Sequence, residues 1–92
     1  MRYHPPVDRD VLRQIEALRR RRHNLKPREV EQVAVAAGWS YDRTVGSHAI
    51  YVKEGFWANL SIPQGKLKGN LATKLLNIIE ASVLHEQEEE DG

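Results

Sequence analysis

The residues best suited to chemistry are Arg43 and His48, which stand on either side of the tight turn predicted at Gly46-Ser47. An imidazole has a pKa of about 6.5, so it can give or take a proton at cellular pH. A histidine directly after a Gly-Ser turn is also held by a backbone of limited freedom, which suits a general base. An arginine can hold a phosphate while negative charge builds on its oxygens. We therefore expect any chemistry of this chain to run through His48.

Composition limits the other kinds of chemistry. The chain has 92 residues, no cysteine and four scattered histidines. Disulfides and zinc-thiolate sites are therefore excluded, and the histidines lack the i, i+3 or i, i+4 spacing of a metal site. We expect one domain that works without a metal or another cofactor. No apolar run approaches the roughly 20 residues of a membrane span, and the first residues lack the apolar segment of a secretory signal, so we expect a cytoplasmic protein.

Charge is distributed unevenly along the chain, although the net charge is only +1. Residues 1–28 hold nine Lys or Arg against three acids, a net of +6, whereas residues 80–92 hold six acids and no Lys or Arg, a net of −6. The run Arg19-Arg20-Arg21-Arg22 suits RNA phosphates or, as a solvated helix end, the negative pole of a helix dipole. The acidic end is typical of a disordered, solubilising tail. A sharper hypothesis is that this tail folds back onto the arginines and competes with RNA.

Hydrophobic periodicity predicts three helices and three strands. Asp8 fits the N-cap of the first helix, and Pro27 fits the first position of the second. Gly38 ends the second helix, and Asn70 fits the N-cap of the last. The expected elements are a helix after Asp8 with apolar Val11, Leu12, Ile15 and Leu18, a helix over 27–37, strands over 39–45, 49–53 and 56–62, and a helix after Gly69-Asn70 with an apolar face through Val83.

These elements predict an α+β fold, a two-layer α-β-β-β-α sandwich with an extra basic helix in front. We divide the chain into a basic helical extension over 1–26, an α-β-β-β-α domain over 27–84 and an acidic, disordered tail over 85–92. The pattern does not decide on which face of the sheet His48 lies. A strand that began at His48 would place its side chain on the same face as Ile50 and Val52. We expect His48 to precede regular strand pairing or to lie beside a bulge.

A set of landmarks occurs in order over roughly residues 27–84: Gly38-Trp39, Arg43 and Gly46-Ser47-His48, followed by Tyr51-Val52, Ile62-Pro63 and Gly69-Asn70-Leu71. This set resembles the HicA family of toxins. The resemblance implies a double-stranded-RNA-binding-like fold, ribonuclease activity against mRNA and neutralisation by a HicB antitoxin. The catalytic histidine of the family would fall on His48. Gln64 stands where many members carry a second histidine, and residues 1–24 have no counterpart in a compact member.

The resemblance implies an mRNA interferase of a toxin-antitoxin system, a metal-independent endoribonuclease in which His48 takes the proton of a ribose 2′-hydroxyl. DNA lacks that hydroxyl, so the substrate must be RNA. Tyr51 and Trp57 could stack on bases, or they could pack within the protein as aromatic residues of small sheets commonly do. The candidate RNA- or phosphate-binding residues are Arg43, Ser47, Lys53, Lys66, Lys68, Lys74, Arg19, Arg20, Arg21 and Arg22.

Alternative interpretations of the same residues stay open. His48 could be a turn histidine hydrogen-bonded to the backbone, and Arg43 could be an exposed strand cation. The chain would then be a non-catalytic RNA-binding module on the same fold, or a protein-interaction domain whose front helix serves dimerisation. The expected partners are mRNA, a HicB-like antitoxin and, through the N-terminal helix, a second copy of the chain.

Overall fold

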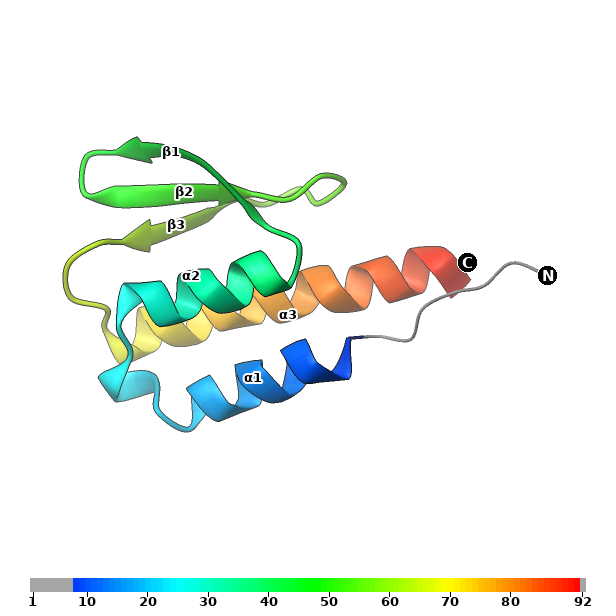
Figure 1. Cartoon of the computed structure of the whole chain (residues 1–92), viewed down its shortest axis with the longest axis horizontal. Helices are drawn as coiled ribbons and strands as arrows, with labels where there is room; N and C mark the ends of the chain where they lie inside the picture. Colours follow the sequence, from blue (N-terminus) through cyan, green and yellow to red (C-terminus); the bar gives the residue numbers. More distant parts are fainter. Residues whose placement is uncertain (1–7, 92) are drawn as a thin grey trace.

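The computed structural model describes the backbone of residues 8–91 and the side chains of residues 8–86 (Figure 1). The order of elements confirms the predicted α+β class, with one helix before an α-β-β-β-α arrangement. α2, β1 and β2 agree with their predicted ranges to within one residue at each end. In chain order the elements are α1 (Arg9–Arg19), the 3-10 turn η1 (Arg22–Asn24), α2 (Pro27–Ala36), β1 (Ser40–Val45), β2 (His48–Val52), β3 (Leu60–Pro63) and α3 (Gly69–Asp91).

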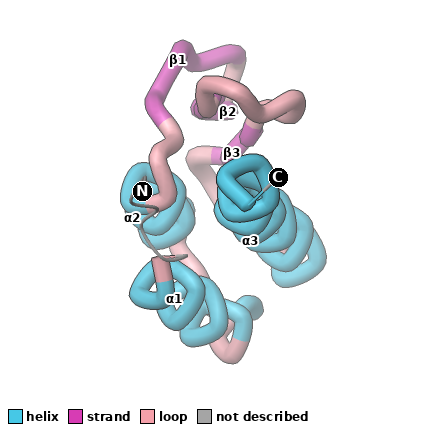
Figure 2. The backbone as a smooth tube through the Cα atoms, turned by 90° about the vertical axis from the view of Figure 1, so that its right-hand side faces the viewer, coloured by secondary structure: helices cyan, strands magenta, loops and turns pink. Residues whose placement is uncertain are grey.

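The elements form three layers, one more than predicted. The antiparallel sheet, in the order β1-β2-β3, lies on one side of α2 and α3, and α1 lies on the other (Figures 1 and 2). Val11, Ile15 and Leu18 of α1 are buried in the same hydrophobic cluster as residues from α2, α3 and the sheet. The helix expected as an extension in front of the domain thus contributes to its core, because its apolar stripe packs on the other two helices.

Local signals begin the first two helices where predicted. The Asp8 carboxylate accepts hydrogen bonds from the backbone N–H groups of Asp10 and Val11, each at 3.1 Å, and so caps α1. At the start of α2, the Glu29 carboxylate accepts the backbone N–H of Lys26 at 3.0 Å and the guanidinium of Arg21 at 2.8 Å. These hydrogen bonds, the backbone one first, hold the pKa of Glu29 below its usual value.

The third strand is shorter than predicted. β3 begins at Leu60, although the alternating pattern predicts a strand from Phe56. The chain instead turns, with the Phe56 N–H donating to the Lys53 carbonyl at 3.1 Å and Gly55 at a φ of 82°. A positive φ at the third position is typical of a type II turn, which glycine adopts without strain. The Phe56 ring then packs edge-on against Trp39, with centroids 5.7 Å apart, instead of extending the sheet.

The acidic end of the chain continues α3 and is not a disordered tail. Helical backbone reaches Asp91, well beyond the core residue Val83. The N-terminal end of α3 packs against η1. There the His23 imidazole lies so close to Gly69 that a side chain at this position would have no room. Glu86 is seventeen residues further along the helix, a rise of about 26 Å. The hypothesis that the acidic residues fold back onto the arginine run is therefore wrong, since the two lie at opposite ends of the molecule (Figure 1).

Candidate functional site

A β-bulge at Asp42 decides which face of the sheet Arg43 occupies. Tyr41 pairs with Tyr51 and Arg43 pairs with Ile50, so Asp42 is an extra residue without a partner on β2. Side chains alternate between faces along a strand, and an extra residue reverses the alternation beyond it. Without the bulge, Arg43 would lie on the helix-facing side with Tyr41. With the bulge, it lies on the outer face of the sheet, away from the helices.

His48 lies on the same outer face. It is the first residue of β2, pairs with Val45 and Pro63, and is exposed. Ala49 and Tyr51 belong to the core cluster, so His48 and the alternate residues that follow it point to the outer side. The expectation that His48 precedes regular pairing is therefore wrong. The bulge lies in the neighbouring strand β1, at Asp42, and not beside His48.

Arg43 and His48 are diagonal neighbours on this face. Arg43 stands opposite Ile50, two residues along β2 from His48. Diagonal positions of this kind are about 7–8 Å apart, within reach of long side chains. The Arg43 guanidinium contacts the Asp42 carboxylate and remains 58% exposed. Both side chains are exposed on this face, and a phosphate there would compete with the Asp42 carboxylate for the Arg43 guanidinium.

The turn before His48 is tightly specified. Gly46 has a φ of 60° and Ser47 has a negative φ, which matches the type II′ turn favoured by two-residue hairpins. Ser47 is exposed, and its carbonyl accepts the backbone N–H of Gln64 at 2.8 Å. The backbone of the hairpin is thus tied to the end of β3, and this contact fixes the position of the His48 backbone.

Gln64 has a structural role. Its side-chain amide donates to the Ile62 carbonyl at 3.1 Å and to the Glu31 carboxylate at 3.3 Å. The same carboxylate accepts the Tyr51 hydroxyl at 2.6 Å. Burial, followed by this contact with Glu31, raises the pKa of Tyr51 to about 12, so the phenol keeps its proton at neutral pH. Tyr51 is only 7% exposed, so it packs inside the protein and does not stack on bases. The sequence does not reveal this role of Glu31, because no motif marks the residue. Its partners are brought to it only when β2 and β3 fold over α2.

Lys53 is the clearest error among the predicted phosphate-binding residues. Its side chain is only 7% exposed. The ammonium contacts the Glu86 carboxylate of α3 and lies 3.4 Å from the Ser82 hydroxyl. Its aliphatic stem passes over Gly38, where an added Cβ would be 3.2 Å from the lysine Cε. Lys53 thus joins the end of β2 to α3 and is unavailable to a ligand.

The arginine run divides into two structural and two available side chains. Arg19 contacts Glu16 at 2.9 Å and, on α3, Asn77 at 2.7 Å and Glu80 at 2.9 Å, which ties α1 to that helix. Arg21 helps to cap α2 through its 2.8 Å contact with Glu29. Within residues 8–86, Arg20 and Arg22 form no ion pair, and the guanidinium of Arg22 has only a long, 3.5 Å contact with a backbone carbonyl.

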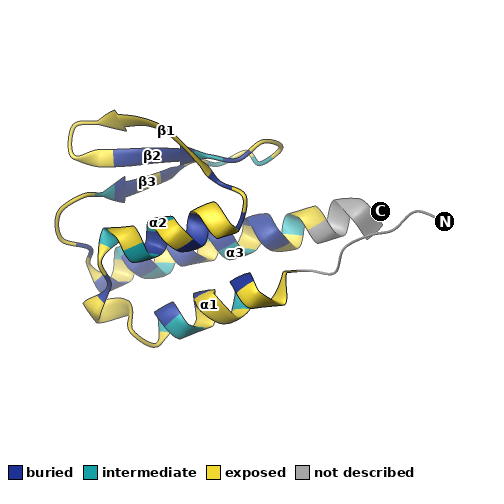
Figure 3. Cartoon of the chain, viewed as in Figure 1, coloured by how far each residue is buried: buried dark blue, intermediate teal, exposed yellow. Residues whose placement is uncertain are grey.

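The available cations gather at one end of the molecule. This end holds the hairpin turn at 46–47, the loop from β3 to α3, and η1 (Figure 1). Lys66 and Lys68 lie on that loop, and Lys74 lies in the second turn of α3; all three are exposed. Every residue of β1 is exposed as well, so the sheet edge beside Arg43 is open to a ligand (Figure 3).

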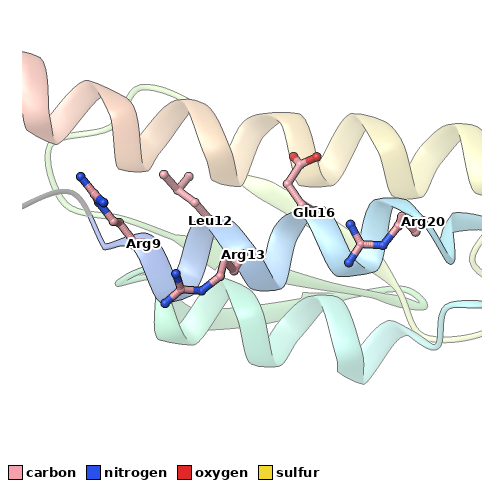
Figure 4. Close-up of a pocket in the computed structure, with 5 residues that line it drawn as sticks. All are labelled: Arg9, Leu12, Arg13, Glu16 and Arg20. Atoms are coloured by element: carbon pink, nitrogen blue, oxygen red, sulfur yellow. The ribbon is translucent and has the colours of Figure 1, made fainter.

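A separate hollow of about 390 Å³ lies along α1, on the far side of the helices from the sheet (Figure 4). Its residues recur at helical spacing and so form one stripe. None of them is a histidine, so the hollow offers no imidazole for proton transfer. The stripe consists of Arg9, Leu12, Arg13, Glu16 and Arg20.

Two further properties concern the described residues as a set. Within them, no group of three or more His, Cys, Asp or Glu side chains is arranged to hold a metal ion. No helix between residues 8 and 91 combines the length and the apolar character needed to cross a bilayer.

Comparisons with protein-family models, with curated proteins and with solved structures gave no match for this chain. The likeness to HicA toxins is thus carried by the motif residues alone, and the chemistry has to be argued from the geometry of the outer face.

Proposed function

We propose that this chain is a HicA-like toxin, an endoribonuclease that cleaves mRNA in the cytoplasm without a metal ion. One observation carries the proposal: the bulge at Asp42 brings Arg43 onto the exposed face that holds His48. A general base and a phosphate-binding cation on one open surface are the minimum that RNA cleavage by the adjacent 2′-hydroxyl requires.

In the proposed reaction, His48 takes the proton of a ribose 2′-hydroxyl and the freed oxygen attacks the neighbouring phosphorus. The bond from phosphorus to the 5′-oxygen breaks, leaving a 2′,3′-cyclic phosphate and a 5′-hydroxyl. Arg43 stabilises the charge that builds on the phosphate oxygens. Gln64 carries no transferable proton and Tyr51 points to the other face, so the departing 5′-oxygen takes its proton from solvent.

RNA reaches this face along the basic end of the molecule. Arg20, Arg22, Lys66 and Lys68 are exposed and form no ion pair within residues 8–86. Folded RNA is held chiefly through its phosphates and 2′-hydroxyls, which such a surface suits. A HicB-like antitoxin would silence the toxin by covering the outer face of the sheet, where β1 leaves an exposed edge.

The requirement for a 2′-hydroxyl tests the reaction directly. A labelled RNA oligonucleotide and the same oligonucleotide with 2′-deoxyribose at the cleaved position are incubated with the protein in the presence of EDTA. We expect the first to be cut to a cyclic-phosphate end and the second to survive, because the attacking oxygen is missing. No cleavage of either, or equal cleavage of both, would contradict the proposal.

The arginine run provides a matched test of RNA binding. Arg20→Ala with Arg22→Ala should lower the slope of log affinity against log salt by about 2, because each cation that neutralises a phosphate contributes nearly one unit. Arg19→Ala with Arg21→Ala removes the same charge from side chains already occupied by carboxylates. It should leave the slope nearly unchanged at temperatures where circular dichroism shows both variants folded. Equal slopes for the two variants would remove these arginines from the RNA surface.

A second candidate function is a non-catalytic RNA-binding module, favoured by the hydrogen bonds that hold Gln64 in a structural role. A module of this kind would bind RNA through the same surface but would not cleave it. RNA that binds with the expected salt dependence and stays intact would select this function over the first.

A further inference from the structure

Trp57 is the most exposed large apolar side chain among residues 8–86, with 87% of its surface accessible. Its ring lies on that of Phe56, with centroids 5.6 Å apart and planes tilted by 31°. Phe56 in turn contacts His85 of α3 at 5.8 Å. Trp57 therefore has an aromatic contact on one side and an open outer face, and we call this exposed side chain the knob.

The surroundings of this knob are acidic. Glu54 precedes it in the same loop and is exposed, and Glu86, which contacts Lys53, remains 61% exposed. The sequence places four more acids at 88–91, on the same helix. Like charge opposes a nucleic acid here, so Trp57 is poorly placed to stack on RNA bases. Tryptophan is the best ring for a cation, and arginine stacks on it well, so this end suits a partner that presents arginines.

The hollow along α1 presents such arginines. Leu12 is half-buried at its base, and Arg9, Arg13 and Arg20 line it (Figure 4). Within residues 8–86, Arg9 and Arg20 form no ion pair, while Arg13 contacts Asp10 and remains 73% exposed. Arg9 also stands in the first turn of α1, where the positive end of the helix dipole disfavours a cation that has no anionic partner.

We propose that Trp57 of one copy of this chain docks into the α1 hollow of a second copy. The ring would lie against Leu12 between the guanidinium groups, while Glu54 and Glu86 would pair with the arginines around it. The contact cannot form within one molecule, because the Trp57 loop and α1 lie on opposite sides of the layer formed by α2 and α3 (Figure 1). The inference does not rest on the proposed ribonuclease activity.

Sedimentation velocity of the full chain tests the contact. A small charged interface is weak, so association is measured at about 0.5 mM protein. We expect association at about 0.01 M salt and its loss at about 1 M, where the Debye length falls from about 30 Å to 3 Å. Trp57→Ala should weaken association roughly 30-fold, as truncation of an interface tryptophan does. Arg9→Ala with Arg13→Ala should abolish it, whereas Tyr41→Ala, another exposed aromatic, should not.

Mixing the variants separates this contact from non-specific aggregation. The Trp57→Ala protein keeps an intact hollow and the Arg9→Ala, Arg13→Ala protein keeps an intact knob, so the two should associate with each other more strongly than either does with itself. Lys66→Ala with Lys68→Ala removes two cations elsewhere and should behave as wild type. Wild type that stays monomeric at low salt, or association that survives both the Trp57 and the arginine changes, would overturn the proposal.

Discussion

Replacing His48 by alanine is expected to slow RNA cleavage by about 10²- to 10⁴-fold, the usual contribution of a general base. The side chain is exposed and forms no hydrogen bond or ion pair within residues 8–86, so its loss should change the free energy of unfolding by at most about 0.5 kcal/mol. RNA affinity should stay the same, because Arg43 and the basic end are untouched. Single-turnover cleavage, RNA binding and urea denaturation measure the three quantities on one preparation.

The control for this variant is His23→Ala. His23 packs over Gly69 at the start of α3 and lies on no strand, so cleavage should continue at the wild-type rate. Expression in cells extends the comparison: wild type and His23→Ala should slow growth and degrade bulk mRNA, and His48→Ala should do neither. If His48→Ala cleaves RNA and slows growth as wild type does, the catalytic role assigned to this residue is lost.

Replacing Trp39 by alanine is expected to destabilise the fold by about 3–5 kcal/mol, the usual cost of truncating a buried aromatic residue. Trp39 is only 2% exposed, and its indole N–H donates to the Ser82 hydroxyl at 3.0 Å. A small domain has about 5–15 kcal/mol of stability in total, so the loss should be plain in a urea titration. The same change at Trp57, which is 87% exposed, should cost at most about 0.5 kcal/mol.

Trp39→Phe separates packing from hydrogen bonding and guards against a variant that fails to fold. It keeps most of the ring volume and removes the indole N–H. The Ser82 hydroxyl still donates to the Ile79 carbonyl at 2.7 Å, so the cost should be about 1–2 kcal/mol. Equal urea midpoints for wild type and the phenylalanine variant, or a larger cost at Trp57 than at Trp39, would contradict this account of the core.

Two predicted sites show where reasoning from single residues fails. Most lysines are exposed, so the sequence favours an exposed Lys53. In the structure Lys53 is buried, and the Glu86 carboxylate, 33 residues later, compensates its charge. Trp57 lies in a segment with the alternation of a strand, yet the turn at Gly55 removes it from the sheet and exposes it. The partner that decides the burial of Lys53 lies far along the chain, whereas the turn at Gly55 is local and overrides the alternation that follows it.

The bulge shows the same limit at the candidate site itself. The Gly46-Ser47 turn and the catalytic candidate His48 can be recognised from the sequence, because turn chemistry depends on a few adjacent residues. Which face Arg43 occupies depends on one unpaired residue, Asp42, and a single extra residue reverses every face beyond it. The sequence contains no marker for that residue, so only the strand register brings Arg43 and His48 together.

The chain by itself determined its helices, its hairpin turn and the alternation that buries Leu60 and Ile62, because caps, turns and periodicity act over a few neighbouring residues. Only the tertiary structure decided that α1 packs into the core, that α3 carries the acidic residues away from the arginine run, and that Arg19 and Arg21 are occupied while Arg20 and Arg22 are not. Each of these features depends on contacts between segments that are distant in the sequence, and a local sequence pattern does not reveal such contacts.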